Sequence, residues 1–319
     1  MRSVEMPALT IGERTARVPV IQGGMAVRIS MAPLAGAVAR AGGIGVIAGS
    51  GLTPEELTAE IAAARGIAGP DGVIGVNIMV AIARFKGLVQ ASLDAGIDLV
   101  IAGAGFSREV FQWCREADTP LVIIVGSDRV AQLAQRFGAA AVIAESFEAG
   151  GHLGTEKSLT ELMPEVLASV DIPVIAAGGI HDGHRIRELI EMGAAGVQMG
   201  SLFAATVESS ASAEFKRMYV ECTADDVMLV KSPVGLPGRA LRNPLAMRLE
   251  NQDYPPIESC VACLKKCNRE YCIIDKLIKA QQGDVDAGLV FAGESAVHVS
   301  EIPTVAQLID RLQAEYASA

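Results

Sequence analysis

A histidine that follows two glycines is the residue of this chain most suited to chemistry. Residues 140–144 are apolar, and the chain then becomes polar at Glu145 and runs through Gly150 and Gly151 to His152. This pattern predicts a short buried strand with polar groups at its carboxyl end, where parallel α/β proteins keep their active sites. Glycine lets the backbone approach a flat or charged ligand, and histidine exchanges a proton near neutral pH. We therefore predict a functional role for His152.

Four of the six cysteines lie within one short segment, residues 259–272, which we call the cysteine segment. They are separated by two, three and four residues and are Cys260, Cys263, Cys267 and Cys272. Four thiolates on so short a segment suit a [4Fe–4S] cluster or a structural zinc ion. The spacing differs from the ferredoxin run, so zinc stays open, and four unligated thiols are the remaining alternative.

Two glycine turns follow neighbouring strands of the predicted sheet. Gly178 and Gly179 come after residues 173–177, and Gly200 and Ser201 come after residues 196–199. In barrels, the loops after the last two strands commonly bind a phosphate group through backbone N–H groups and a helix N-terminus. The alternative is two ordinary tight turns.

Eight short apolar segments, each followed by a segment with helical character, must position these residues. They are residues 18–21, 43–47, 73–79, 99–102, 121–125, 140–144, 173–177 and 196–199. Glycines recur between the helices and the next strands, as left-handed helix C-caps do. The repeat predicts an α/β fold, a (β/α)8 TIM barrel, and leaves an open doubly wound sheet as the alternative.

The pattern changes beyond residue 203. We assign residues 1–205 and part of the C-terminal region to the barrel, and residues 206–319 to an extension that partly covers the site as a lid. This C-terminal extension carries a Pro/Gly loop at residues 231–239, the four-cysteine segment, and an amphipathic helix near residues 304–316.

Composition limits the partners. The net charge of −10 argues against a nucleic-acid binder, and no apolar run of about 18 residues predicts a membrane span or anchor. We therefore expect a soluble, cytoplasmic protein without a membrane partner and leave a homodimer open. Residues 231–279 carry nine basic against five acidic residues, so they are basic within an acidic chain. Such a face steers an acidic partner, although a basic lid that balances the charge of a cluster is the alternative.

Five motifs, taken together, resemble the nitronate monooxygenase (2-nitropropane dioxygenase) superfamily, which also holds FMN-dependent enoyl-acyl-carrier-protein reductases. They are QGGM at 22–25, GVNI around Asn77, EAGGH ending at His152, AAGGI at 176–180 and QMGS at 198–201. The resemblance implies FMN on a TIM barrel, with His152 as the acid or base. The cofactor contacts that it implies are Gln22, Gly23, Gly24, Met25, Asn77, Glu145, Gly150, Gly151, Gly178, Gly179, Gly200 and Ser201. The last four of these would hold the phosphate.

The Pro/Gly loop and the cysteine segment differ from plain nitronate monooxygenases and look more like an iron–sulfur branch that acts on acyl-carrier-protein thioesters. This likeness implies an oxidoreductase of acyl or enoyl thioesters, a [4Fe–4S] cluster rather than zinc, and a carrier protein or coenzyme A thioester as partner. NAD(P)H is then a candidate electron donor. The alternatives are oxidation of alkyl nitronates by O2, a non-flavin isomerase or lyase of sugar phosphates, and a redox sensor without turnover.

Overall fold

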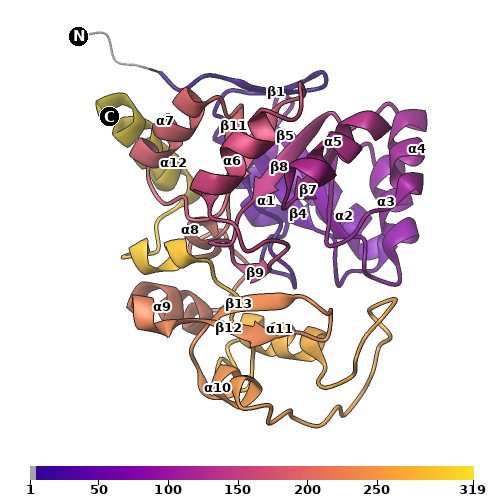
Figure 1. The fold of residues 1–319 in the computed structure, drawn as a ribbon, viewed down its shortest axis with the longest axis vertical. Coiled ribbons are helices and arrows are strands. Elements are labelled where there is room, and N and C mark those ends of the chain that lie inside the picture. Colours follow the sequence, from indigo (N-terminus) through magenta and orange to yellow (C-terminus); the bar gives the residue numbers. More distant parts are fainter. Residues whose placement is uncertain (1–4) are drawn as a thin grey trace.

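A closed barrel of eight parallel strands forms the main body of the computed structural model, which describes residues 5–319 (Figure 1). The strands in chain order are β3 (Val20–Gln22), β4 (Ile44–Ala48), β5 (Val73–Met79), β6 (Leu99–Gly103), β7 (Leu121–Val125), β8 (Ala141–Glu145), β10 (Val174–Ala177) and β11 (Gly196–Met199). The last strand, β11, pairs with the first, β3, and places Met199 opposite Gln22. This pairing confirms the predicted (β/α)8 barrel and excludes the open sheet.

Helices surround the barrel. They are α1 (Ala32–Arg40), α2 (Pro54–Ala68), α3 (Phe85–Asp94), α4 (Arg108–Glu116), α5 (Asp128–Phe137), α6 (Leu159–Leu167) and α7 (Gly183–Met192), followed by the short α8 (Ser201–Ala204). Thr53 caps α2 in a reciprocal box with Glu56, as its sequence predicts. The C-terminal helix α12 (Val305–Ser318) returns to pack against α7 and α1. It therefore completes the outer layer of the barrel at the end of the chain.

A hairpin that the sequence analysis did not predict closes the N-terminal end of the barrel. It consists of β1 (Leu9–Ile11) and β2 (Arg14–Ala16), which lie across the barrel in Figure 1. Leu9 and Ile11 are fully buried in the cluster that fills the barrel interior. Strands of three residues carry too little periodicity to be recognised from sequence.

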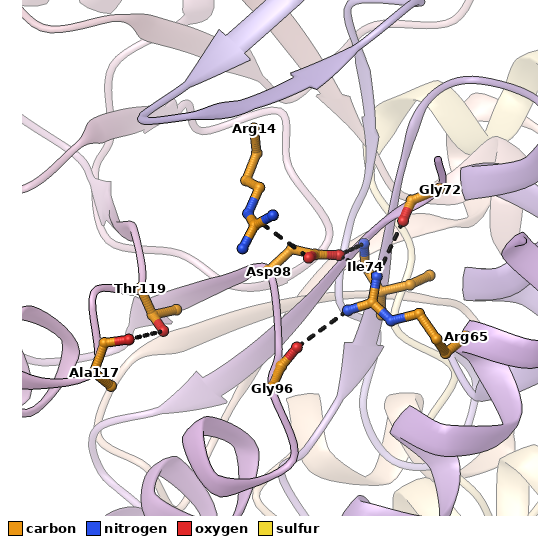
Figure 2. A network of polar contacts seen from close by, with 8 residues as sticks. All are labelled: Arg14, Arg65, Gly72, Ile74, Gly96, Asp98, Ala117 and Thr119. Carbon is orange, nitrogen blue, oxygen red and sulfur yellow. Dashed lines mark hydrogen bonds and ion pairs between the residues drawn. The ribbon is translucent and has the colours of Figure 1, made fainter. Parts of the chain in front are cut away.

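A polar network around Asp98 lies at this same end, just before β6 (Figure 2). The Asp98 carboxylate accepts hydrogen bonds from the Ile74 N–H at 2.8 Å and Arg65 Nη1 at 2.6 Å, and Arg14 Nε lies 3.7 Å away. Arg65 also donates to the carbonyls of Gly72 and Gly96. Because these groups satisfy one another, the network ties α2 to the ends of two neighbouring strands.

Residues 206–298 contain a smaller unit, drawn mostly in orange and lying beside the carboxyl end of the barrel in Figure 1. Its elements are α9 (Ala213–Glu221), η1 (Ala224–Asp226), β12 (Val227–Lys231), β13 (Pro237–Leu241), α10 (Pro244–Glu250), α11 (Ile273–Gln282) and η2 (Glu294–His298). Strand β13 pairs antiparallel with β9 (Gly151–His152), so that Gly238 lies opposite His152. The extension is thus joined by a sheet to the loop that carries the predicted catalytic histidine. Within residues 5–319, no helix combines the length and the apolar character needed to cross a bilayer.

Candidate active site

A cavity of about 230 Å³ opens at the carboxyl ends of the barrel strands, between the barrel and the C-terminal extension. It brings together every predicted site residue except Gln22 and the cysteines. Those lining it are Gly23, Gly24, Met25, Asn77, Glu145, Gly150, Gly151, His152, Gly178, Gly179, Gly200 and Ser201. Residues far apart in the sequence meet here because all eight strands of a barrel end on one face.

Gln22 lies behind the cavity instead of in its wall. Its Nε2 donates to the carbonyl of Gly23, to Ser30 Oγ at 2.9 Å and to the carbonyl of Val46, while its Oε1 accepts from the Val46 N–H. The side chain is fully buried, and both ends of its amide are engaged with the protein. The Gln22 amide therefore holds the Gly23–Gly24 turn in place, and its contact with the cofactor stays a prediction.

The glycines of the cavity are required by its backbone geometry. A Cβ atom on Gly24 would lie 2.3 Å from the Cβ of Asn77, which is far inside van der Waals contact. Gly178 and Gly179 have φ angles of 103° and 69°, which side chains rarely tolerate. A Cβ atom on Gly178 would also lie 2.2 Å from Ser146 Oγ. These turns therefore bring bare backbone to the cavity wall.

The His152 imidazole lies in the wall between two elements of the extension. Its Nε2 is 2.7 Å from Ser232 Oγ, and its ring meets the ring of Phe291 edge-on, with centroids 5.1 Å apart and an angle of 76°. Burial lowers the pKa of His152 to about 4. The imidazole is therefore neutral at pH 7.

Two carboxyl groups border the same cavity. Glu145 ends β8, and burial raises the pKa of its carboxyl to about 7, so that it is partly protonated at neutral pH. Both oxygens of Glu148 accept from the N–H of Leu159, the first residue of α6, at 3.1 Å. The Glu148 carboxylate therefore binds the start of a helix and borders the cavity.

Two polar atoms near the cavity lack a partner among the described residues. Gln198 Oε1 and Ser146 Oγ are buried, and neither forms a hydrogen bond with the protein. Gln198 lines the cavity at the end of β11. A buried acceptor without a partner is costly, so its position suits a bound ligand that carries N–H groups, such as the ring of a flavin.

The C-terminal extension, expected to cover part of the site, contributes wall residues that the sequence did not single out. These wall residues are Tyr219, Leu277, Phe291, Ala292, Gly293 and Ser295. The N–H of Gly293 donates to Ser201 Oγ at 3.1 Å, which joins the extension to the loop after β11. One signal was available, because residues 289–293 form an apolar run that ends in glycine, like the barrel strands.

The cysteine segment lies against the loop that follows β5. The N–H of Ala83 donates to the carbonyl of Cys263, and the N–H of Lys265 donates to the carbonyl of Ala81, both at 2.9 Å. The metal site predicted on Cys260, Cys263, Cys267 and Cys272 is not confirmed. In residues 5–319, no group of three or more His, Cys, Asp or Glu side chains could hold a metal ion.

Basic residues of the extension are less available than their number in the sequence indicates. Arg239 and Lys276 are buried, and they pair with Glu294 and Asp275. Lys265 is exposed, but its ammonium donates to the carbonyl of Val80 at 2.7 Å. Burial and pairing therefore reduce the positive charge that residues 231–279 present to a partner.

The sequence matches the nitronate monooxygenase family over residues 9–85 and 71–315, which covers both the barrel and the extension. The chain belongs to the nitronate monooxygenase family. Membership of this family makes it an FMN-dependent oxidoreductase.

Two relatives within the curated proteins carry the same name, (3aS,4S,5R,7aS)-5-hydroxy-7a-methyl-1-oxo-octahydro-1H-indene-4-carboxyl-CoA dehydrogenase. The protein from Mycobacterium tuberculosis is 33% identical over 73% of this chain and 65% of its own length. The protein from Rhodococcus jostii is 27% identical over 93% of this chain and 92% of its own length. Among solved structures, FabK from Thermotoga maritima is 32% identical with a TM-score of 0.82, covering 94% of this chain and 93% of FabK.

Proposed function

We propose that this family member oxidises or reduces an acyl or enoyl thioester over bound FMN. The observation that carries the proposal is the chemistry of the cavity wall. Its described residues are mostly apolar, with Met25, Ile29, Met79, Ile124 and Phe291 among them, and include no lysine or arginine. The acyl part of a thioester is neutral and apolar, whereas a nitronate is an anion, which gains stability from a cation in its site. Similarity to two carboxyl-CoA dehydrogenases supports the same choice.

FMN fits the residues present. We propose that Gly178, Gly179, Gly200 and Ser201 hold its phosphate, because the first two expose backbone in left-handed conformations and α8 begins at Ser201 without a side-chain cap. Met25, Asn77, Gln198 and the turns at 23–24 and 150–151 would then surround the ring and its ribityl chain. When bound, FMN supplies the redox chemistry, while the protein binds, orients and protonates the substrate.

In this proposal, His152 and Glu145 handle protons beside the flavin. His152 is neutral and borders the cavity, so it can bind a substrate carbonyl or exchange a proton with the carbon next to it. Glu145 is a second proton carrier, because the pKa of its carboxyl lies near 7. The burial that shifts both groups in opposite directions also excludes water from the reacting atoms.

A steady-state comparison of substrates tests the function. The purified protein, with its flavin released by heat and identified by chromatography, would be assayed with enoyl and acyl thioesters of coenzyme A and with alkyl nitronates, under air and without oxygen. We expect FMN, and turnover of a thioester that does not require O2. FAD would overturn the cofactor assignment, and turnover confined to nitronates in air would overturn the substrate in favour of the alternative, nitronate oxidation.

We propose that Lys266 and Arg269 attract the phosphates of a coenzyme A or carrier-protein thioester. Both are exposed on the cysteine segment, whose neighbour is the loop after β5 at the cavity end of the barrel. Attraction between these positive side chains and the negative phosphates raises the rate at which the thioester meets the protein, and salt screens this attraction. Replacing both residues with Glu should raise KM for the thioester at low salt more than at high salt. Glu replacements of Arg129 and Arg136 on α5, which change the net charge equally, serve as the control.

The [4Fe–4S] cluster remains a prediction. Zinc is its alternative, and no group of described side chains could hold a metal ion as they lie in residues 5–319. The four cysteines do influence one another, because the pKa of Cys263 is raised first by burial and then by the charges of Cys272, Cys267 and Cys260. Iron and sulfide analysis of protein purified without oxygen tests the prediction, and their absence would refute it.

A further inference from the structure

The hydrogen-bond partners of Ser232 determine which nitrogen of His152 carries the proton. Ser232 is only 5% exposed and lies in the loop between β12 and β13. Its Oγ accepts from the N–H of Val234 at 3.3 Å and lies 2.7 Å from His152 Nε2. A hydroxyl group has one hydrogen to donate, and His152 Nε2 is the only acceptor that the described residues offer to it. A Ser232 hydroxyl that donates to His152 Nε2 has a partner for its hydrogen, whereas the reverse direction leaves that hydrogen without an acceptor among the described residues.

This assignment leaves the other nitrogen as a donor. A neutral imidazole whose Nε2 accepts a hydrogen bond carries its proton on Nδ1. No described residue forms a hydrogen bond with Nδ1 of His152. Nδ1 is also absent from the fully buried polar atoms that lack a partner, so it keeps some accessible surface. Since the His152 ring lines the cavity, its Nδ1–H is open to a ligand there.

The loop that holds Ser232 is anchored on both sides by the cysteine segment. The hydroxyl of the fully buried Tyr271 donates to the carbonyl of Lys231 at 2.9 Å, and the N–H of Asn268 donates to the carbonyl of Pro233 at 3.4 Å. The Phe291 ring fixes the plane of the imidazole from the other side. Ser232 is thus held in place, and it holds His152 in turn.

We propose that Ser232 is a positioning residue that locks His152 in the Nδ1–H form, so that a neutral imidazole donates a hydrogen bond to the carbonyl oxygen of the substrate. The substrate class in this inference rests on the proposed function, but the proton position does not. A neutral imidazole donates well to an oxygen that gains negative charge in the transition state and needs no charged form in a buried site. The low pKa of His152 agrees with this role.

The first test reads the imidazole directly and needs no substrate. The chain has four histidines, so nitrogen NMR of the ¹⁵N-histidine-labelled holoenzyme can be assigned with His152→Ala. We expect His152 to show a protonated Nδ1 and an unprotonated Nε2 at pH 7, and Ser232→Ala to show a mixture of both forms. A protonated Nε2 in the wild type, or an unchanged ratio in Ser232→Ala, would overturn the inference.

The second test measures kcat and KM of Ser232 variants with the substrate that the wild-type protein turns over. Ser232→Ala should lower kcat about ten-fold with little change in KM, because it loosens a donor that acts mainly in the transition state. Ser232→Thr, which keeps the hydroxyl, should restore most of kcat, and Ser92→Ala, which removes a buried hydroxyl on α3, should leave kcat unchanged. Equal loss in the Ala and Thr variants would overturn the role of the hydroxyl. If no thioester is turned over at all, the proposed function fails, while the NMR result still decides the proton position.

Discussion

At the N-terminal end of the barrel the carboxylate of Asp98 has a partner on every side, whereas at the carboxyl end Ser146 Oγ and Gln198 Oε1 have none among the described residues. Asp98 is 6% exposed, and its carboxylate faces the guanidinium groups of Arg14 and Arg65 and the N–H of Ile74 (Figure 2). At the other end, burial raises the pKa of Glu145 and lowers that of His152. Polar groups at the Asp98 end hold strands together, whereas polar groups at the cavity end are available to a ligand.

The difference between the two ends separates polar groups that stabilise the folded chain from polar groups that destabilise it. A buried polar group without a partner destabilises the folded chain, so such groups persist where a bound molecule completes them. Gly178 and Gly179 at the same end take left-handed conformations that only glycine adopts without strain, so substitution there costs stability. Substitutions at the two ends should therefore act on different observables, namely stability at the Asp98 end and turnover or ligand binding at the cavity end.

The largest effect is expected at the cavity end. His152→Ala should lower kcat by about 10²–10⁴-fold, because general acid–base contributions and the hydrogen bond to substrate are lost together. Steady-state kinetics and the flavin absorbance of the purified variant measure the result. His184→Ala on the exposed face of α7 is the matched control and should keep full activity. Wild-type turnover in the His152 variant would remove its catalytic role.

The next effect is expected at the opposite end, and it should appear in stability. Asp98→Asn should reduce the free energy of unfolding by about 2–3 kcal/mol, since hydrogen bonds from Arg65 and the Ile74 N–H lose a charged acceptor. Urea denaturation measures the loss, with Asp94→Asn on the exposed surface of α3 as control. The kcat of the folded variant should stay close to the wild-type value. A large loss of kcat in Asp98→Asn without a loss of stability would contradict the assignment of a purely structural role to the Asp98 end.

A smaller effect should follow pH. The pKa of Glu145 is about 7 in the folded chain against 4.5 ordinarily, so folding takes up a proton between those values. The contribution of Glu145 to the stability of the flavin-free protein should therefore fall as pH rises from 4.5 through 7, by on the order of 1–2 kcal/mol, since water in the cavity reduces the full value.

Glu145→Gln removes this titration. When the pH rises from 5 to 8, the stability of this variant in thermal unfolding should therefore fall less, or rise more, than that of the wild type, while Glu109→Gln on exposed α4 should behave as the wild type. His152 acts in the opposite direction, because its lowered pKa means that stability is lost as pH falls from 6.5 to 4. Equal pH dependence in Glu145→Gln and the wild type would show that Glu145 is not the buried acid.

The smallest effect tests the partnerless hydroxyl of Ser146. Ser146→Ala should raise the stability of the flavin-free protein by up to about 1 kcal/mol, since it removes a buried group that has no hydrogen bond. Ser169→Ala, which removes a hydroxyl bonded to the Val166 carbonyl, should lower stability slightly. A loss of stability in Ser146→Ala would mean that the hydroxyl has a partner, and the contrast between the two ends would weaken.

Local pattern alone determined the barrel. Each strand is an apolar run that ends in glycine or a polar residue, and each run could be recognised without knowing what it packs against, as the agreement at Val73–Met79 and Leu121–Val125 illustrates. The motifs at the strand ends predicted most of the cavity wall for the same reason, since carboxyl ends of parallel strands meet on one face.

Tertiary structure decided what depends on long-range packing. Gln22 is polar at a strand end, like Asn77, and only the contacts with Ser30 and Val46 turn it away from the cavity. Ser232 and Phe291 lie 80 and 139 residues beyond His152, and only folding brings them into contact with its ring, which they fix. The shifted pKa values of Glu145 and His152 likewise follow from burial, and the type of a residue does not reveal how deeply it is buried.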